Sequence, residues 1–507
     1  MSDNPPPNDL AADGGTAELD PWGSSTVDDY RDLFDRFGIE PFESILADVP
    51  DPHYLMRRGV IFGHRDYDRV TAAIRAGDPV AALSGFMPTG DPHIGHKLVF
   101  DELIWHQQQG ADAFALIADL EAHSARSMDW ASIDRHARDY VLSLIALGFD
   151  PDEGELYHQS TNRTVRDLAF ELGIEANFSE LAAIYGFDGE TSVSHMESVL
   201  TQMADILYPQ LDGPRPTVIP VGPDQDPHVR LARDLARRLR FFGVTEAYAS
   251  FEAEPAEHAV IGRAYDALTD HEDIRCADAA DWIETRVDDV PPEVVDRTIE
   301  KLRATGREPL KPRVRFLNRR APAAAVEALE GAIDGHKRSY EEHIDAFELS
   351  IDEARDLVRS VEIDHGGYGF EAPSSIYHRF MSGLTGGKMS SSIPASHISL
   401  LDPPEAGAAK VRAATTGGRE TAELQRELGG EADKCPVYEL YAYLLCGDDD
   451  EYARRVYDEC VGGDRLCGDC KAEAADLMAA FLADHQHQRD EAEAVLDEID
   501  FDASPTR

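Results

Sequence analysis

Two short segments, far apart in the chain, constrain its fold more than any other feature. The first, Pro88–His96, reads PTGDPHIGH, and the second, Gly386–Ser392, reads GGKMSSS. The first segment follows a short apolar run, residues 81–84, which is typical of a buried strand. After it, apolar residues recur near the 3.6-residue period of a helix. The pattern predicts a strand, a loop and a helix, an arrangement that directs backbone N–H groups at an anion.

The residue types in both segments suit a bound nucleotide. His93 and His96 are three residues apart and therefore share one face of the first helical turn, where both can donate hydrogen bonds to phosphate oxygens. Gly95 permits close approach of the backbone to a purine ring. Lys388 is the only cation of the second segment, and an ammonium suits a polyphosphate that gains charge at its leaving end. Either segment alone is also typical of an ordinary surface pair or a solvated linker, but the two together predict a nucleotide site.

These segments resemble the HIGH and KMSKS motifs of class I aminoacyl-tRNA synthetases, and residues 83–98 are similar to the archaeal and eukaryotic type of tryptophanyl-tRNA synthetase. The likeness covers residues 40–245 and 365–490. The further stretches that carry it are Ile117–Ala122, Gln202–Leu207, Val221–His228, Gly417–Arg419 and Cys435–Tyr441. The resemblance implies ATP-dependent activation of L-tryptophan and its transfer to tRNA(Trp), with ATP and Mg²⁺ as substrate and a homodimer as the working form.

The resemblance also implies roles for particular residues. Its catalytic group is Lys388, which stabilises the transition state as pyrophosphate leaves, with His93 and His96, which bind the phosphates. The remaining ATP-binding residues are Thr89, Gly90, Gly95, Gly222, Asp224, Met389, Ser390 and Ser391. The tryptophan-binding residues are Gln202, as acceptor for the indole N–H, and Gln225 and Glu121 near the α-amino group. Two positions depart from the family pattern, because Ser391 replaces the second lysine of KMSKS and Leu83 falls where eukaryotic members place a tyrosine.

Three other functions fit parts of the sequence. A tyrosyl-tRNA synthetase shares this architecture and differs in its amino-acid pocket. A small-substrate nucleotidyltransferase also uses a His-x-Gly-His loop, although it does not need the long helical C-terminal region predicted below. A non-enzymatic RNA-binding protein would not require His93, His96 and Lys388 together.

The charge of the chain is extreme. Its 48 basic residues stand against 97 acidic ones and give a formal net charge of −49, which opposes RNA binding at low salt. A very salty cytoplasm reconciles this charge with an RNA substrate, because the screening length falls to about 3 Å at 1 M salt. We therefore expect a cytoplasmic enzyme of a halophile. No long apolar stretch and no signal-peptide pattern occur, so neither a membrane span nor export is expected.

The order of predicted elements indicates an α/β fold with a Rossmann-type parallel sheet and a helical C-terminal anticodon-binding domain. Strands are expected near residues 81–84, 112–118, 155–158, 216–221 and 374–378. The predicted segments are a disordered tail (1–25), a mostly helical N-terminal subdomain (26–80), the first half of the catalytic domain with the HIGH-type motif (81–245), an acidic and then basic insertion (246–345), the second half with the KMSKS-type loop (346–402) and the anticodon-binding domain (403–507).

Within the insertion, residues 301–320 reverse the charge of the chain. They hold eight basic residues, and Glu308 is the only acidic one. Such a run is typical of an RNA-contact patch, or of side chains that pair with the protein's own acidic surface. We favour the second interpretation.

Cysteines gather near the C-terminus. Six residues separate Cys460 from Cys467 and two separate Cys467 from Cys470, and a fourth cysteine lies upstream at Cys435 or Cys446. Cys435 is the preferred fourth ligand because it stands at a predicted helix start, where the helix dipole favours a thiolate. Four thiolates suit either a [4Fe–4S] cluster or a structural zinc ion, and the spacing resembles an iron–sulfur pattern of some tryptophanyl enzymes. Reduced structural thiols are the alternative in a cytosolic protein.

Overall fold

The computed structural model describes residues 33–34, 37–248, 251–268, 274–387, 389, 393–499 and 501. The predicted tail, residues 1–25, lies outside this range. The chain divides into two compact units. The second unit consists of Leu211–Pro214 and Ala236–Phe370, and the first contains the remainder.

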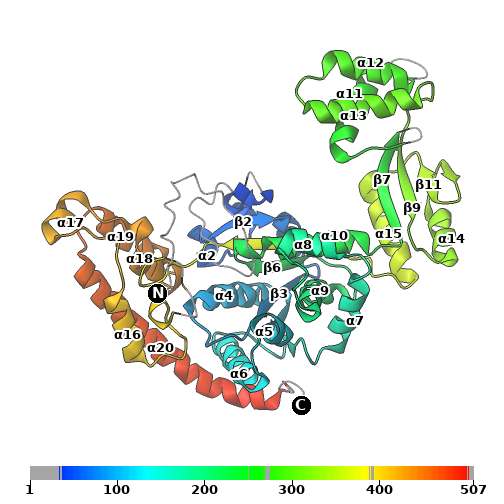
Figure 1. The fold of residues 1–507 in the computed structure, drawn as a ribbon. Coiled ribbons are helices and arrows are strands. Elements are labelled where there is room, and N and C mark those ends of the chain that lie inside the picture. The colour runs from blue at the N-terminus through cyan, green and yellow to red at the C-terminus, as the bar shows by residue number, and fades with distance from the viewer. Residues whose placement is uncertain are drawn as a thin grey trace, which may run out of the picture. The chain divides into compact units, whose positions relative to one another are not determined.

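The first unit is built around a seven-stranded sheet in the order β1-β2-β12-β6-β3-β4-β5 (Figure 1). The strands are β1 (Glu40–Pro41), β2 (Ile61–Arg65), β3 (Ala81–Phe86), β4 (Asp112–Ile117), β5 (Gly154–His158), β6 (Thr217–Val221) and β12 (Ser374–His378). The five strands from β12 to β5 run parallel, and most of their side chains are buried, as in parallel sheets covered on both faces. This is the predicted Rossmann-type sheet, with strands at the predicted places.

The first two strands lie in a segment where mostly helix was predicted. The strand β2 pairs antiparallel with β12, and β1 pairs antiparallel with β2. The sequence of β2, IFGHR, is buried over its first four residues and shows no polar–apolar alternation, because its side chains are enclosed on both faces. Part of the segment 26–80 therefore extends the catalytic sheet.

The strand order reverses next to β3. The strands β3, β4 and β5 follow one another towards one edge, whereas β6 returns to the other side of β3 and β12 lies beyond it. In open α/β sheets, ligands bind in the crevice at the carboxyl ends of the strands that flank such a switch point. The carboxyl ends of β3 and β6, at Phe86 and Val221, are therefore the expected place for a site.

Helices cover this sheet. The helix α3 (Tyr67–Ala76) packs on β12 and β6, and α4 (Ile94–Gln108) packs on β3, β4 and β6. The other helices of this region are α2 (Tyr54–Arg57), α5 (Asp119–Arg126), α6 (Trp130–Ala146), α7 (Arg163–Leu172), α8 (Phe178–Tyr185), α9 (Val193–Leu207) and α10 (Asp226–Arg238). The helix α9 packs against α5 and α7.

The C-terminal region is helical, as predicted. It comprises α16 (Pro404–Ala413), α17 (Ala422–Leu428), α18 (Pro436–Leu440), α19 (Asp450–Val461) and α20 (Cys467–Glu498). Figure 1 shows α20 running beside α6, which it contacts. Leu98 of α4 and Leu482 of α20 belong to one continuous apolar core. The C-terminal helices and the catalytic sheet therefore share a core.

The second unit has its own antiparallel sheet, in the order β10-β11-β9-β7-β8. Its strands are β7 (Phe242–Tyr248), β8 (Phe251–Glu252), β9 (Pro312–Asn318), β10 (Lys337–Ser339) and β11 (His343–Ala346), and its helices are α11 (Pro255–Leu268), α12 (Cys276–Arg286), α13 (Pro292–Thr305), α14 (Ala323–Ala332) and α15 (Ile351–Asp364). The helices α11, α12 and α13 pack on one another, and α15 packs on β7. The unit contains the predicted insertion, 246–345, and continues beyond it through α15.

None of the helices in the described ranges is both long and apolar enough to cross a membrane.

Candidate active site

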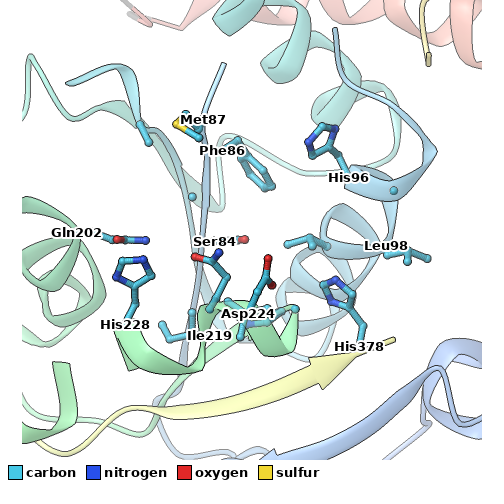
Figure 2. Close-up of a pocket in the computed structure, with 18 of the residues that line it drawn as sticks. Ser84, Phe86, Met87, His96, Leu98, Gln202, Ile219, Asp224, His228 and His378 are labelled. Atoms are coloured by element: carbon cyan, nitrogen blue, oxygen red, sulfur yellow. The ribbon is translucent and has the colours of Figure 1, made fainter. Parts of the chain in front are cut away.

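A pocket of about 390 Å³ lies at the switch point of the first unit. Its lining includes the ends of β3 and β6, the start of α4, the inner face of α9 and the end of β12. Figure 2 shows Gln202 and His228 on one wall, His96 and His378 on the other, and Asp224 between them.

The start of α4 is fixed by its two histidines. The His93 ring accepts a hydrogen bond from the Gly95 backbone through Nδ1 (3.1 Å), and His96 Nδ1 accepts from the His93 backbone N–H (3.1 Å). The two rings stack with their centroids 3.8 Å apart. Because each Nδ1 accepts a hydrogen bond, the proton of each neutral ring is assigned to Nε2. Each imidazole thus caps the helix and keeps one N–H donor.

Both histidines are held in the neutral form. Burial lowers the pKa of His96 to about 3, and His397 lowers it further by like charge. The pKa of His93 is also lowered, first by burial and then by the nearby rings of His96 and His397. The His96 Nε2 atom lies 3.1 Å from the Tyr140 hydroxyl. The site therefore offers hydrogen-bond donors to a phosphate rather than fixed positive charge.

Gly95 is required by close packing at this point. A Cβ atom there would lie 2.9 Å from His93 Cε1 and 3.4 Å from the sulfur of Met389, which is buried against the helix start. Gly222, after β6, is similarly constrained, because a Cβ atom would lie 2.7 Å from Asp224 Oδ1. The two motifs thus meet at one pocket, since Met389 belongs to the GGKMSSS segment. Lys388, Ser390 and Ser391 lie outside the described residues.

One wall of the pocket carries an unused acceptor. Gln202 projects from α9, and its Oε1 atom is buried without a hydrogen-bond partner in the described part of the chain. Apolar side chains such as Leu83, Leu116 and Ile206 also line the pocket. Gln159 Oε1, in the same lining, is likewise buried without a partner among the described residues. A buried acceptor beside apolar side chains suits a flat apolar group that carries an N–H.

A second buried polar group shares this pocket and was not predicted. Asp205 accepts hydrogen bonds from the Tyr157 hydroxyl (2.9 Å) and from Gln159 Nε2 (2.6 Å). Burial raises the pKa of Asp205 to about 8, against the opposing effect of these two hydrogen bonds. Asp205 lies three residues after Gln202, on the same face of α9, and this spacing was the signal available in the sequence.

Two further lining residues are carboxyl and imidazole groups with shifted pKa values. Burial raises the pKa of Glu121 to about 7, opposed by Arg126. His228 lies with its Nδ1 2.9 Å from the Tyr185 hydroxyl, and burial lowers its pKa to about 3. Glu121 was predicted, whereas His228 was not.

A buried pair lies at the end of β12. His378 Nδ1 is 3.4 Å from Glu102 Oε1, and Glu102 is buried on α4. Burial raises the pKa of Glu102, and His378 opposes that rise. His378 lines the pocket (Figure 2). The helix α4 is therefore linked to the pocket lining in two ways, by its own His96 and by the pair of its Glu102 with His378 of β12.

Most of the predicted site residues lie together. The ones that line this pocket are Thr89, His93, Gly95, His96, Glu121, Gln202, Gly222, Asp224, Gln225 and Met389. Gly90 is not among the lining residues.

The four predicted cysteine ligands gather at a second, much smaller cavity of about 20 Å³. Cys435, Cys460, Cys467 and Cys470 all line it, and all are free thiols. Burial and the neighbouring thiols raise the pKa of Cys460. Two glycines leave room for the sulfurs. A Cβ atom at Gly418 would lie 2.3 Å from Cys467 Sγ, and one at Gly430 would lie 2.8 Å from Cys460 Sγ. We call this set of four cysteines the cysteine cradle; Cys446 is buried elsewhere and is not part of it.

The sequence matches the family of class I tRNA synthetases (W and Y) over residues 75–250 and 348–483. It is 66% identical to tryptophan–tRNA ligase 1 of Halobacterium salinarum, over 98% of this chain and 99% of that protein. It is 46% identical to the tryptophan–tRNA ligase of Methanosarcina acetivorans, over 95% of this chain and 98% of that protein.

A solved structure agrees. The crystal structure of tryptophanyl-tRNA synthetase from Aeropyrum pernix is similar with a TM-score of 0.65 and 32% identity, covering 96% of this chain and all of that one. The fold, the pocket at the switch point and these relatives lead to one conclusion: the chain belongs to the tryptophanyl-tRNA synthetases, within the class I aminoacyl-tRNA synthetase family.

Proposed function

We propose that the pocket at the switch point holds ATP beside L-tryptophan and forms tryptophanyl-adenylate, from which the tryptophanyl group passes to tRNA(Trp). A carboxylate oxygen of tryptophan attacks the α-phosphorus of ATP, the bond from that phosphorus to the bridging oxygen breaks, and pyrophosphate leaves. Mg²⁺ enters with ATP as part of the substrate and neutralises charge on the phosphates.

The nucleotide half of the site rests on the start of α4. Neither ring is charged; His93 keeps an Nε2–H donor for a phosphate oxygen, and His96 can offer its Nε2–H to a phosphate oxygen in place of the Tyr140 hydroxyl. Thr89, Gly90 and Gly95 are proposed for the adenosine. Gly222 and Asp224 are proposed for the ribose, since both follow β6 at the switch point.

Lys388 is proposed as the group that stabilises the departing pyrophosphate. It is the only cation in its segment, and the sulfur of its neighbour Met389 would lie 3.4 Å from a Cβ atom at Gly95, at the start of α4. Ser390 and Ser391 are proposed as hydroxyl donors to the same phosphates.

The observation that carries the choice of tryptophan is the buried Oε1 of Gln202, which has no partner in the described residues and belongs to a lining that also holds the apolar Leu83, Leu116 and Ile206. An indole N–H would satisfy that acceptor. Glu121 and Gln225 are proposed near the α-amino group, where a carboxylate at Glu121 would pair with the ammonium. A site built to bond an N–H rejects analogues that lack it by roughly 10⁴–10⁵.

Amino-acid-dependent exchange of pyrophosphate into ATP tests this proposal. The full chain is assayed in multimolar KCl with each of the twenty amino acids. We expect exchange with tryptophan and background rates with the other nineteen. Exchange that depends on tyrosine instead would overturn the assignment of Gln202.

We further propose that the cysteine cradle holds a metal group. Four free thiols around one cavity, with glycines that leave room for the sulfurs, form a donor set that fits a [4Fe–4S] cluster or zinc. The volume of the cavity and the spacing of the sulfurs favour different metals. The cavity of about 20 Å³ suits a single zinc ion. However, no three cysteine sulfurs among the described residues lie within 4.8 Å of one another, whereas tetrahedral zinc with Zn–S bonds of about 2.3 Å would hold its sulfurs about 3.8 Å apart. The wider sulfur spacing and the iron–sulfur-like sequence spacing of Cys460, Cys467 and Cys470 favour the cluster, which we propose.

In this cradle the group would tie together α18, α19 and α20 and would play no part in adenylate chemistry. Anaerobic purification followed by iron and zinc analysis tests the proposal, with Cys460→Ser as the variant and Cys276→Ser, a buried cysteine of the second unit, as the matched control. Iron that is lost only in Cys460→Ser supports the cluster. Zinc with the same pattern would make the site structural zinc, and four titratable thiols without metal would exclude both.

We also propose a cytoplasmic homodimer. The substrates ATP and tRNA support the compartment, and the family resemblance supports the dimer. Light scattering in multimolar KCl measures the mass of the particle, and a monomer at all protein concentrations would exclude the dimer.

A further inference from the structure

The second unit contains a cleft of about 760 Å³ that no part of the activity above uses. It is lined by β9, β10, β11 and the segments beside them. The match to the synthetase family leaves out residues 251–347, which supply nearly all of this lining. The cleft therefore belongs to a part of the chain whose role the family match does not explain.

Two cations at this cleft lack acidic partners. Acids outnumber bases 97 to 48 in this chain, and several other cations of the unit are paired: Lys301 lies 2.7 Å from Glu257, and Arg303 lies 2.5 Å from Glu284. Lys311 and Arg338 are exposed at the cleft, and neither has an acidic side chain within ion-pair distance in the part of the chain that the structure describes. The pairing predicted for residues 301–320 therefore holds for Lys301 and Arg303 but not for Lys311.

The floor of the cleft carries surplus positive charge. Asp345 is fully buried and is shared by two guanidinium groups, at 2.8 Å from Arg315 Nε and 3.3 Å from Arg313 Nη1. The side chain of Arg313 is only 9% exposed, and its Nε is buried without a hydrogen-bond partner among the described residues. A buried donor without a partner costs about 1–3 kcal/mol, which an acceptor from a ligand would recover.

Flat rings stand beside these cations. Tyr340 is 49% exposed and stacks on His343 with centroids 4.5 Å apart and planes 20° apart. His336 stacks on Phe347 at 4.7 Å and 17°, and the Arg338 guanidinium lies 5.5 Å from the centroid of the Phe347 ring. Exposed rings flanked by guanidinium groups are the surface on which unpaired bases stack.

The balance of charges decides which nucleic acid fits. Four cations of the lining (Lys311, Arg313, Arg315 and Arg338) face three carboxylates (Glu308, Asp345 and Glu348), a surplus of only one. A duplex is held mainly through many phosphate contacts, which high salt weakens. A short unpaired segment needs few phosphate contacts and gains from stacking, which salt screens little.

We propose that this cleft binds an unpaired stretch of the RNA substrate, with a base stacked on Tyr340 and its phosphates beside Lys311 and Arg338. The proposal rests on the tRNA ligase activity for the identity of its partner, and it goes beyond that activity by placing an RNA contact outside the residues that the family model matches.

Binding of tRNA(Trp) to full-length variants in multimolar KCl tests the proposal. We expect Tyr340→Ala to raise the dissociation constant roughly ten-fold or more, since one stacked base contributes about 1–3 kcal/mol. Tyr340→Phe should restore binding because it keeps the ring, and Arg338→Ala should weaken binding to a smaller degree. The matched control is Arg263→Ala, which removes one exposed arginine of the same unit that pairs with Asp289 away from the cleft.

Tryptophan-dependent pyrophosphate exchange needs no tRNA and should stay unchanged in all four variants, so a failure of adenylate formation is distinguishable from a failure of the cleft. A short unpaired RNA should compete for the cleft better than a duplex of equal length. Wild-type tRNA affinity in both Tyr340→Ala and Arg338→Ala would overturn the proposal, and equal competition by the duplex would overturn its unpaired character. If Tyr340→Ala does not fold, as judged by circular dichroism, Arg338→Ala and Lys311→Ala decide the matter, because both side chains are exposed and unpaired.

Discussion

The pocket of the first unit encloses about 390 Å³ between apolar side chains, histidines and buried carboxyl groups, whereas the cleft of the second unit holds about 760 Å³ between charged groups and exposed rings. In the pocket, Gln202 presents a buried acceptor without a partner in the described residues. In the cleft, Tyr340 and Arg338 stand exposed. One very acidic chain can therefore handle two kinds of ligand in two different ways. A rigid small substrate is selected by buried groups, and a flexible polymer is held by accessible ones.

Low salt provides the test with the largest expected effect. At a net charge of −49, lowering the ionic strength leaves repulsion across each folded unit unscreened, so we expect both cavities to be lost as the chain unfolds. Circular dichroism during dialysis from multimolar KCl to ~0.1 M, where the screening length is ~10 Å, follows this loss. A spectrum and melting temperature retained at low salt would contradict it.

Replacing Lys388 should slow adenylate formation in the pocket and leave tRNA binding at the cleft unaffected. We expect Lys388→Ala to lower the rate of adenylate formation by about 10²–10³, the usual cost of losing one preorganised transition-state donor. Tryptophan affinity and tRNA affinity should change little. Single-turnover adenylate formation measures the rate, and Lys434→Ala, an exposed lysine of the C-terminal region, is the control. An unchanged rate would remove Lys388 from the mechanism.

Replacing the buried acceptor should also act only on the pocket. In Gln202→Met the indole N–H would lose its partner at a cost of about 1–3 kcal/mol, which lowers kcat/KM for tryptophan roughly 10- to 100-fold. The control is Gln108→Met on the exposed face of α4. Pyrophosphate exchange at varied tryptophan concentration gives kcat/KM, and a wild-type value for Gln202→Met would assign the indole contact to another residue.

The KM for tryptophan should depend on pH through the titration of Glu121. Burial raises the pKa of this carboxyl to about 7, so below that pH the free enzyme holds a neutral acid that must lose its proton before it can pair with the tryptophan ammonium. We expect KM for tryptophan to rise by up to about ten-fold for each pH unit below 7 and to level off above it. Exchange assays between pH 6 and 8.5 measure KM.

The control for this pH dependence is Glu121→Gln, in which KM should be high and constant across the range. Asp205, whose pKa is raised to about 8, lines the same pocket. A pH dependence that persists in Glu121→Gln would therefore assign the titration to Asp205.

The smallest expected effect concerns how strongly tRNA affinity at the cleft depends on salt concentration. Each phosphate contact with a single strand contributes about 0.7 to the slope of log affinity against log salt, so the double variant Lys311→Ala/Arg338→Ala should lower that slope by about 1.4. Tyr340→Ala should weaken tRNA binding without changing the slope, because stacking releases no counterions. Titrations at several KCl concentrations measure both, and a slope that changes in Tyr340→Ala would show that the ring acts through charge.

Much of the pocket could be predicted because its signals are local in sequence. The strand β3, its loop and the start of α4 lie within one short stretch, and the apolar run and the spacing of His93 and His96 indicated all three. The parallel strands and the C-terminal helices were predicted from the same kind of pattern.

The remaining features depend on distant contacts. The strand β2 pairs with β12 more than 300 residues later, as Ile376 faces His64, and no local pattern reports such a partner. Asp205 and Gln159 form their hydrogen bond only after β5 and α9 have packed, so neither was predicted as part of the site. Likewise, the basic run 301–320 was recognised, but its division between paired and unpaired cations depends on which acids the fold of the second unit brings near.

The way the second unit is joined to the first has a consequence for how such enzymes diversify. The main segment of the unit, Ala236–Phe370, lies within the connection from β6 to β12, and these strands are hydrogen-bonded neighbours from Val218 opposite Ser374 to Val221 opposite Tyr377. The sheet holds both ends of that connection in place, and lengthening a connection costs little free energy, because the closure entropy grows only slowly with length. The main segment of the second unit can therefore differ in length between such enzymes at little cost to the sheet that carries the pocket.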